Sequence, residues 1–278
     1  MSSRLILCAD DFALTREIST TIAALARKAC LNAVSCMAAM PNWADDARML
    51  EGIEEVECGA FGHVQVGLHL VLTSERPITR MSCLDQEGKL PGPDRLLLLL
   101  LARRIDLAEF ALEIDRQFEA FVRARGCPPA FVDAHQHVHV YPGMRQLVIA
   151  AVKRHAPDAW VRVPADGISP MLARPFRAKA VGSTLHSLGL CRALARAGIA
   201  ANRSFAGHYD FRGSYADRLP RFLEHGSRAH LVMCHPGAGL APGDSIAAAR
   251  IEEARVLGQM TLAQRIAELS QDAPRRST

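Results

Sequence analysis

The sequence has 278 residues, a formal net charge of +4, 49% hydrophobic residues and 22% charged residues. This composition is ordinary for a globular enzyme, and the length suits one large α/β domain over residues 1–278. Because the basic residues are dispersed and the longest apolar run spans only residues 96–102, we expect neither a nucleic-acid partner nor a membrane span.

The eight cysteines indicate a reducing compartment. None of them lies in a Cys-x-x-Cys pair, which argues against a thiolate zinc site. Several lie within apolar runs, as small core residues do. The first predicted strand begins within four residues of the N-terminus, which leaves no room for a signal peptide, so we expect a cytoplasmic protein.

The first predicted strand, Leu5–Ala9, runs directly into Asp10 and Asp11. A buried strand gains nothing from ending on two acids unless negative charge is needed there, and ligands of α/β folds bind at the carboxyl ends of strands. Neighbouring residues of an extended chain point opposite ways, so the two carboxylates are expected to share one cavity in different roles. The alternative is one helix cap and one solvated acid.

Strands and helices are predicted to alternate along the rest of the chain. One helix is predicted directly after Thr15, which can cap it. Further helices are predicted at residues 45–51, 96–101, 107–124, 142–155, 188–199, 215–224 and 246–257, the last with an amphipathic pattern. The predicted strands span residues 33–39, 64–68, 130–132, 160–163, 204–207 and 230–234. This rhythm predicts about seven parallel strands joined by right-handed crossovers. A (β/α) barrel, fully or incompletely closed, is the expected fold, and an open doubly wound sheet is the alternative.

Two segments depart from this rhythm. Residues 73–95 contain three prolines and two glycines and form an irregular excursion, and loops of this length often border active sites. A frayed polar tail is expected from about residue 270.

Four predicted strand ends carry polar residues: Asp10 with Asp11, His69, Asp133 with His135, His137 and His139, and His235. In a barrel all four ends open on one rim. If residues 133–139 are extended, the three histidines face one side, and not all of them need be metal ligands. One Asp and two His form an open ligand set that suits zinc or another transition metal better than magnesium. With a free carboxylate and a histidine nearby, this set predicts metal-assisted hydrolysis.

The chain resembles the YdjC-like carbohydrate deacetylases. The motifs that match, in the family's order, are residues 9–12 (ADDF), 66–70 (VGLHL), 133–139 (DAHQHVH) with Pro142, and 233–237 (MCHPG). The resemblance implies a barrel-like fold and metal-dependent removal of an N-acetyl group from an amino sugar, such as a chitooligosaccharide. It also implies Asp11, His69 and His135 as ligands of one divalent ion, Mg²⁺ in the family's usual description, with Asp10 as general base and His235 as general acid.

Two positions differ from the family's pattern. Ala13 replaces the usual glycine after Asp-Asp-Phe, and an alanine is strained there if the position needs a positive φ. Ala134 replaces the usual serine of Asp-Ser-His, which removes a hydroxyl but no ligand.

Candidate substrate contacts are His137, His139, Arg162, Trp43 and Tyr141. Arg162 alternatively steadies Asp10 or forms a purely structural ion pair, and the two aromatic residues alternatively pack in the core or the rim. The sequence does not fix which acetylated sugar is the substrate, and a homodimer is the default assembly.

Two other functions are alternatives. A metal-dependent phosphoesterase would need ligands for a second metal or a basic phosphate clamp, and neither is evident. A non-catalytic sugar- or metal-binding barrel would not need a base and an acid beside the metal.

Overall fold

The computed structural model describes residues 5–165, 177–224, 229–239 and 243–272. Within these ranges seven parallel strands form one sheet, in the order β5-β4-β3-β2-β1-β7-β6. The strands are β1 (Leu5–Phe12), β2 (Ala33–Cys36), β3 (Gln65–Leu70), β4 (Phe131–Ala134), β5 (Trp160–Val161), β6 (Ser204–Ala206) and β7 (His230–Cys234). The predicted α/β fold with about seven parallel strands is therefore confirmed.

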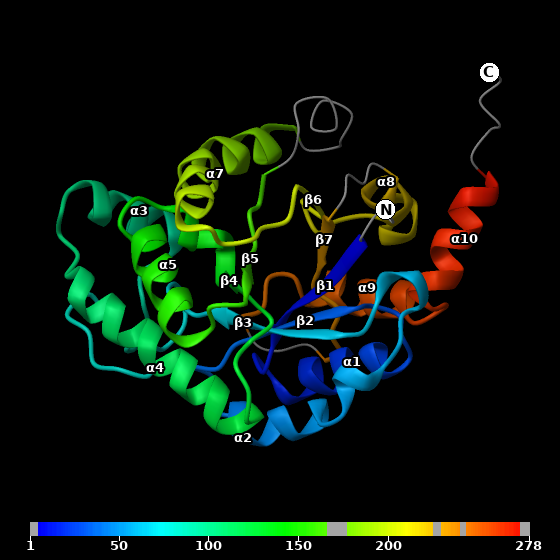
Figure 1. Ribbon diagram of the computed structural model, residues 1–278, viewed down its shortest axis with the longest axis horizontal. Helices are drawn as coiled ribbons and strands as arrows, with labels where there is room; N and C mark the ends of the chain where they lie inside the picture. The colour runs from blue at the N-terminus through cyan, green and yellow to red at the C-terminus, as the bar shows by residue number, and fades with distance from the viewer. Residues whose placement is uncertain (1–4, 166–176, 225–228, 240–242, 273–278) are drawn as a thin grey trace.

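Helices surround the outer face of the curled sheet (Figure 1). The α-helices are α1 (Arg16–Arg27), α2 (Trp43–Asp46), α3 (Pro93–Leu101), α4 (Leu107–Arg125), α5 (Met144–His155), α7 (Arg177–Ala197), α8 (Tyr215–Leu223), α9 (Ala247–Leu257) and α10 (Leu262–Asp272). The 3₁₀-helices are η1 (Ala47–Leu50), η2 (Ile53–Glu55), η3 (Gly59–Phe61) and η4 (His135–Val140). Helix α10 is not foreseen in the sequence pattern, and residues 273–278 of the predicted tail lie outside the described residues.

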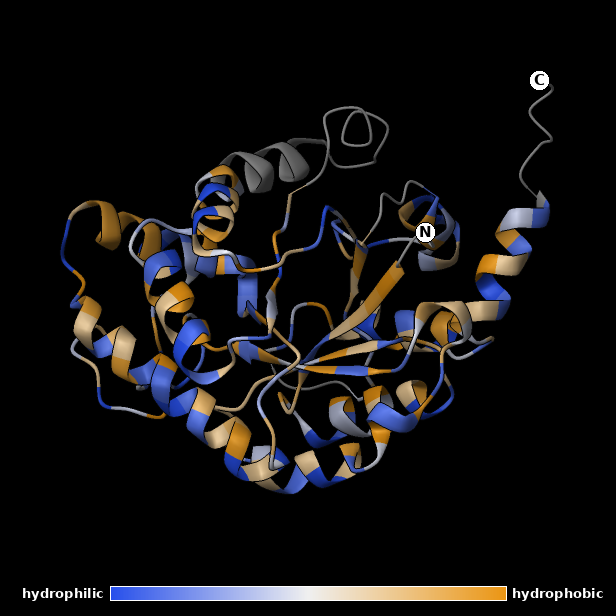
Figure 2. Cartoon of the chain, in the orientation of Figure 1, coloured by the Kyte–Doolittle hydropathy of each residue, from blue (hydrophilic) through white to orange (hydrophobic). Residues whose placement is uncertain are grey.

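Local sequence signals explain where several helices begin and end. The Thr15 hydroxyl accepts the Ile18 N–H and caps α1, and the Asp106 carboxylate accepts the Ala108 N–H and caps α4. Gly126 ends α4 in the left-handed conformation, with φ 74°. The leucine run forms α3, which is mostly orange in Figure 2. Of its leucines only Leu96 is fully buried.

The sheet curls toward a barrel, but within the described residues no ladder of strand hydrogen bonds joins β5 to β6. Instead, Val161 forms one bridge with Ala201, and its N–H donates to the Ala200 carbonyl at 2.9 Å. The Asn202 side chain then accepts the Val163 N–H at 2.7 Å and donates to the Val163 carbonyl at 2.8 Å. One backbone bridge and a side-chain amide thus join the two edges in place of a full ladder, and the fold is an incompletely closed (β/α) barrel.

Residues 135–139 differ from the extended segment considered above. They form η4, in which Gln136 and His137 have left-handed φ values of 54° and 58°. The expected alternation of histidines on one side is therefore wrong. His137 lines the large cavity described below, whereas His139 is completely buried.

Candidate active site

A cavity of about 640 Å³ opens at the carboxyl ends of β1, β3, β4 and β7. All five residues with predicted ligand or proton-transfer roles line it: Asp10, Asp11, His69, His135 and His235. Glu75 and Lys89 also line it. Since both belong to the irregular segment 73–95, that excursion borders the cavity as expected.

Asp10 and Asp11 reach the same cavity because β1 contains a bulge. Ala9 pairs with Val34 and Phe12 with Cys36, so β1 has one more residue than β2 between these pairs. Asp11 has a φ of 66° within the bulge. In a regular strand the two side chains would point to opposite faces, and a bulge re-aims one of them.

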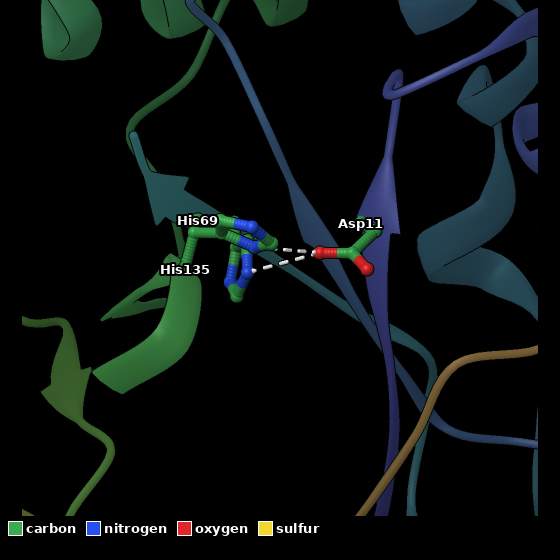
Figure 3. A group of neighbouring side chains, drawn as sticks. All are labelled: Asp11, His69 and His135. Atoms are coloured by element: carbon green, nitrogen blue, oxygen red, sulfur yellow. Dashed lines mark hydrogen bonds and ion pairs between the residues drawn. The ribbon is translucent and has the colours of Figure 1, made fainter. Parts of the chain in front are cut away.

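Asp11 lies beside two histidines from other elements (Figure 3). Its Oδ1 atom lies 3.0 Å from His135 Nδ1 and 3.4 Å from His69 Nε2. Donor atoms of the three side chains all lie within 4.8 Å of one another. Burial raises the pKa of Asp11, but the Arg250 guanidinium and His135 lower it more, so the net pKa is well below the usual range. The structure therefore unites three donors that are far apart in sequence.

His69 is oriented by two polar side chains behind it. Its Nδ1 atom lies 2.6 Å from Asp133 Oδ1 and 3.1 Å from the Ser35 hydroxyl, which itself donates to Asp133 at 2.6 Å. If His69 donates its Nδ1–H to Asp133, the free lone pair of the ring lies on Nε2, the nitrogen that faces Asp11. Burial lowers the pKa of His69, but Asp133 and Asp11 raise it to about 10. Cation binding through Nε2 would thus release a proton.

Arg162 lies behind Asp10 and is completely buried. Its guanidinium donates to both carboxylate oxygens of Asp10, at 2.5 Å and 2.6 Å, and lies 2.6 Å from Asp133. Burial raises the pKa of Asp133, but Arg162 and His69 lower it to about 2. The contact with Asp10 is common to two of the alternatives for Arg162, the residue that steadies Asp10 and the structural ion pair.

His235 lies at the end of β7 and is held by helix α9. Its backbone N–H donates to Glu253 Oε2 at 2.5 Å, and the Phe211 ring lies edge-on to its imidazole at 5.4 Å. Burial lowers the pKa of His235 to about 4, although the Asp11 and Asp10 carboxylates oppose this. The imidazole is therefore neutral near pH 7 before any substrate charge develops.

Two site residues of α9 are not identified from the sequence pattern. Arg250 and Glu253 are 3% and 0% exposed, whereas Ile251 is 43% exposed. The predicted amphipathic pattern is thus reversed at these positions, because this part of the buried face of α9 packs on the polar site, whereas Val256 and Leu257 pack in the hydrophobic core. The sequence does contain a signal that this face is buried: Arg250 and Glu253, three residues apart, share one helix face with small alanines.

Three of the predicted substrate contacts lie in the protein interior. Trp43 is 3% exposed, donates its indole N–H to the Ala120 carbonyl at 3.0 Å and stacks on Phe121. His139 Nε2 lies 2.8 Å from the Arg162 carbonyl, and both of these residues are fully buried. None of the three lines the cavity within the described residues, so we do not retain them as substrate contacts.

The other two candidates differ from each other. Tyr141 is half-buried against the main core and is absent from the described lining of the cavity. His137 lines the cavity and lies edge-on to Phe205 and to His208, each at 5.5 Å. His137 is therefore the candidate substrate contact whose position suits that role.

Ala13 has a φ of 76°, so the position that differs from the family's glycine does require a left-handed residue. The conformation costs a non-glycine residue about 1–2 kcal/mol. Ala13 is completely buried, and burial of its methyl group offsets about 0.8 kcal/mol of that cost. The difference is small enough for the fold to tolerate.

Curated relatives align with little more than half of the chain. A chitooligosaccharide deacetylase of Proteus mirabilis (strain HI4320) is 30% identical over 158 residues, which are 56% of this chain and 58% of the relative. A chitooligosaccharide deacetylase of Yersinia pestis (strain Pestoides F) is 36% identical over 151 residues, which are 54% and 56% of the two chains. The match thus spans about half the length of these relatives.

A solved structure and a family model extend the similarity to nearly the whole chain. The crystal structure of an Enterococcus faecalis V583 protein, to which cellobiose-phosphate cleavage has been ascribed, superposes with a TM-score of 0.70 at 16% identity. It covers 97% of this chain and 95% of its own, and it supports the fold alone. No helix in the described part of the chain has the length and apolar character to cross a membrane. The family described as "YdjC-like protein" matches residues 4–268, and the chain therefore belongs to this family.

Proposed function

We propose that this protein is a metal-dependent hydrolase that removes an N-acetyl group from an N-acetylated amino sugar. The observation that carries the proposal is the meeting of Asp11, His69 and His135 in one cavity with Asp10 and His235. The names of the two deacetylase relatives support the same reaction and a chitooligosaccharide-like substrate.

The three donors fit a divalent cation. Ligand atoms about 2.0–2.1 Å from a zinc ion lie about 3.3 Å apart at a tetrahedral angle. The Asp11 oxygen lies 3.0 Å and 3.4 Å from the two histidine nitrogens, which matches this spacing. Two imidazoles favour zinc or another transition metal, whereas the family resemblance suggests magnesium.

A cation held by these side chains would supply Lewis-acid activation of the acetamide carbonyl and of a water molecule. Asp10 would accept the proton of the attacking water, because it borders the cavity and its neighbour Arg162 fixes the orientation of its carboxylate. Asp10 Oδ1 accepts from both Arg162 and the Cys8 thiol, whereas Oδ2 accepts from Arg162, so a lone pair remains on Oδ2 for the incoming proton.

His235 would protonate the departing amine. Its low pKa means that it must first take up a proton, which solvent water would supply, while Asp10 returns the proton of the attacking water to solvent. Negative charge that develops on the substrate beside it raises the pKa of an imidazole, which favours this uptake. His137 would contact the sugar from the wall that it forms with His208.

The compartment and the assembly complete the proposal. All eight cysteines are free thiols, and five of them are buried, which suits the cytoplasm. A homodimer stays the default expectation for the assembly.

The test is acetate release from N-acetylglucosamine and diacetylchitobiose by metal-stripped protein, reconstituted with zinc, cobalt, manganese or magnesium. We expect release with at least one ion and its loss in His69→Ala. His63→Ala, which changes an exposed histidine, should match the unmodified protein. Phosphate release from a phosphorylated sugar would instead favour a phosphoesterase. Metal binding without turnover would favour a binding protein.

A further inference from the structure

Arg250 contacts the side of Asp11 that faces away from the histidines. Its Nη2 atom donates to Asp11 Oδ2 at 2.7 Å, and its Nε atom donates to Asp244 Oδ2 at 2.7 Å. The side chain is 4% exposed. Asp11 Oδ1 meanwhile faces His69 and His135. The two oxygens of one carboxylate therefore have different partners.

The surrounding backbone holds Arg250 in this position. The Gly237 N–H donates to the Arg250 carbonyl at 3.1 Å. A Cβ atom at Gly237 would lie only 3.2 Å from Arg250 Cδ and 2.9 Å from Ile18 Cγ1, so the loop packs tightly on the arginine stem. A charge-assisted hydrogen bond in such a packed setting fixes the plane of the Asp11 carboxylate.

We infer that Arg250 is a positioning residue that restricts Asp11 to one-oxygen binding of the cation. The inference rests on the metal site in the proposed function. A carboxylate that binds a metal through both oxygens must turn both of them toward the ion, whereas Arg250 holds Oδ2 on its own side of the carboxylate and Oδ1 faces the histidines. The site then offers one donor each from Asp11, His69 and His135, which leaves the remaining coordination positions for water and substrate.

The test compares crystal structures of the cobalt-loaded protein, which give the distance from the ion to each Asp11 oxygen. In the unmodified protein we expect Oδ1 within about 2.2 Å of the ion and Oδ2 still on Arg250. In Arg250→Met the freed carboxylate should bind through both oxygens. Arg250→Lys keeps one donor near Oδ2 and should retain one-oxygen binding.

Two further variants keep the result interpretable. Arg255→Met alters an arginine of the same helix that pairs with Glu252 at the surface, and it should leave one-oxygen binding unchanged. Arg250→Ala also removes the donor from Oδ2 and replaces Arg250→Met if that variant does not fold. Two bound oxygens in the unmodified protein, or one bound oxygen in the Met or Ala variant, would overturn the inference.

Acetate release, measured on the same preparations, separates this inference from the proposed function. Two-oxygen binding with normal acetate release in the unmodified protein would reject the role of Arg250 alone. One-oxygen binding without acetate release from any sugar would reject the deacetylase reaction and leave the role of Arg250 standing.

Discussion

Arg162 and Asp10 form a buried, two-pronged ion pair at the back of the cavity. Nη1 donates to Oδ2 at 2.5 Å and Nη2 donates to Oδ1 at 2.6 Å, the geometry in which a guanidinium and a carboxylate bind most strongly. Arg162 Nη2 also pairs with Asp133 Oδ2 at 2.6 Å. One arginine thus orients the proposed base and, through Asp133, the histidine His69.

Loss of Arg162 is expected to destabilise the fold strongly. Arg162→Met leaves the carboxylates of Asp10 and Asp133 buried without their cation, and breaking such a pair costs about 3–5 kcal/mol. Urea denaturation measures the free energy of unfolding. The control Arg154→Met breaks an exposed pair with Asp115, which should cost less than about 1 kcal/mol. Equal losses in the two variants would contradict the structural role of Arg162.

Asp10→Asn is expected to impair proton transfer and to leave metal binding unchanged. The amide cannot accept the water proton, so the turnover number should fall by about 10²–10⁴-fold. The affinity for the cation, measured by calorimetry, should stay near that of the unmodified protein because the three donors are intact. Asp45→Asn at the surface serves as control. Full activity of Asp10→Asn would contradict the assignment of Asp10 as the general base.

Asp133→Asn is expected to weaken cation binding without removing a ligand. The carboxylate accepts a hydrogen bond from His69 Nδ1 at 2.6 Å, and loss of such a partner typically costs about 10–100-fold in metal affinity. Asp115 forms a similar pair with His155 at 2.9 Å outside the cavity, so Asp115→Asn is a matched control. The prediction fails if calorimetry gives the same affinity for both variants.

Glu253 is expected to make the stability of the protein depend on pH. Burial raises the pKa of Glu253 from 4.5 to about 7, although Tyr209, His235 and Arg250 oppose this and Asp10 adds to it. The folded state therefore binds this proton more tightly than the unfolded state. Its stabilising contribution is complete below about pH 4.5 and is lost as the pH rises through about 7.

The corresponding measurement is the free energy of unfolding at about pH 5 and pH 8. Glu253→Gln mimics the protonated acid, so its decrease in stability between these values should be smaller than in the unmodified protein. Glu252→Gln changes the partly exposed neighbour on α9 and should leave the decrease unchanged. A decrease of the same size in Glu253→Gln would assign the pH dependence to other groups.

Periodicity and caps predicted much of the fold because they act locally. The helix expected at 107–124 is observed at Leu107–Arg125, and the chain leaves it at Gly126, which adopts a left-handed φ. The strand ends that carry Asp11, His69 and His135 do meet at one rim. Parallel strands have a common direction, so polar residues at their carboxyl ends converge without further information.

The parts that the sequence did not predict depend on tertiary contacts. Gln136 and His137 adopt left-handed conformations that no glycine signals. Arg250 and Glu253 escaped notice because helical patterning assigns charged residues to solvent, whereas here they face the partners Asp11 and His235. Trp43 has the character of a sugar-stacking residue, and its burial, its hydrogen bond to Ala120 and its packing on Phe121 identify it as core.

The bulge in β1 also determines how the site responds to change elsewhere in the protein. Asp10 and Asp11 are joined by one peptide unit, so their Cα atoms are about 3.8 Å apart whatever the surrounding packing does. A substitution that shifts β1 relative to its neighbours moves the proton acceptor and the carboxylate donor together. The Cα separation of these two residues is therefore set by covalent bonds, whereas the directions of their carboxylates depend on the bulge conformation at Asp11.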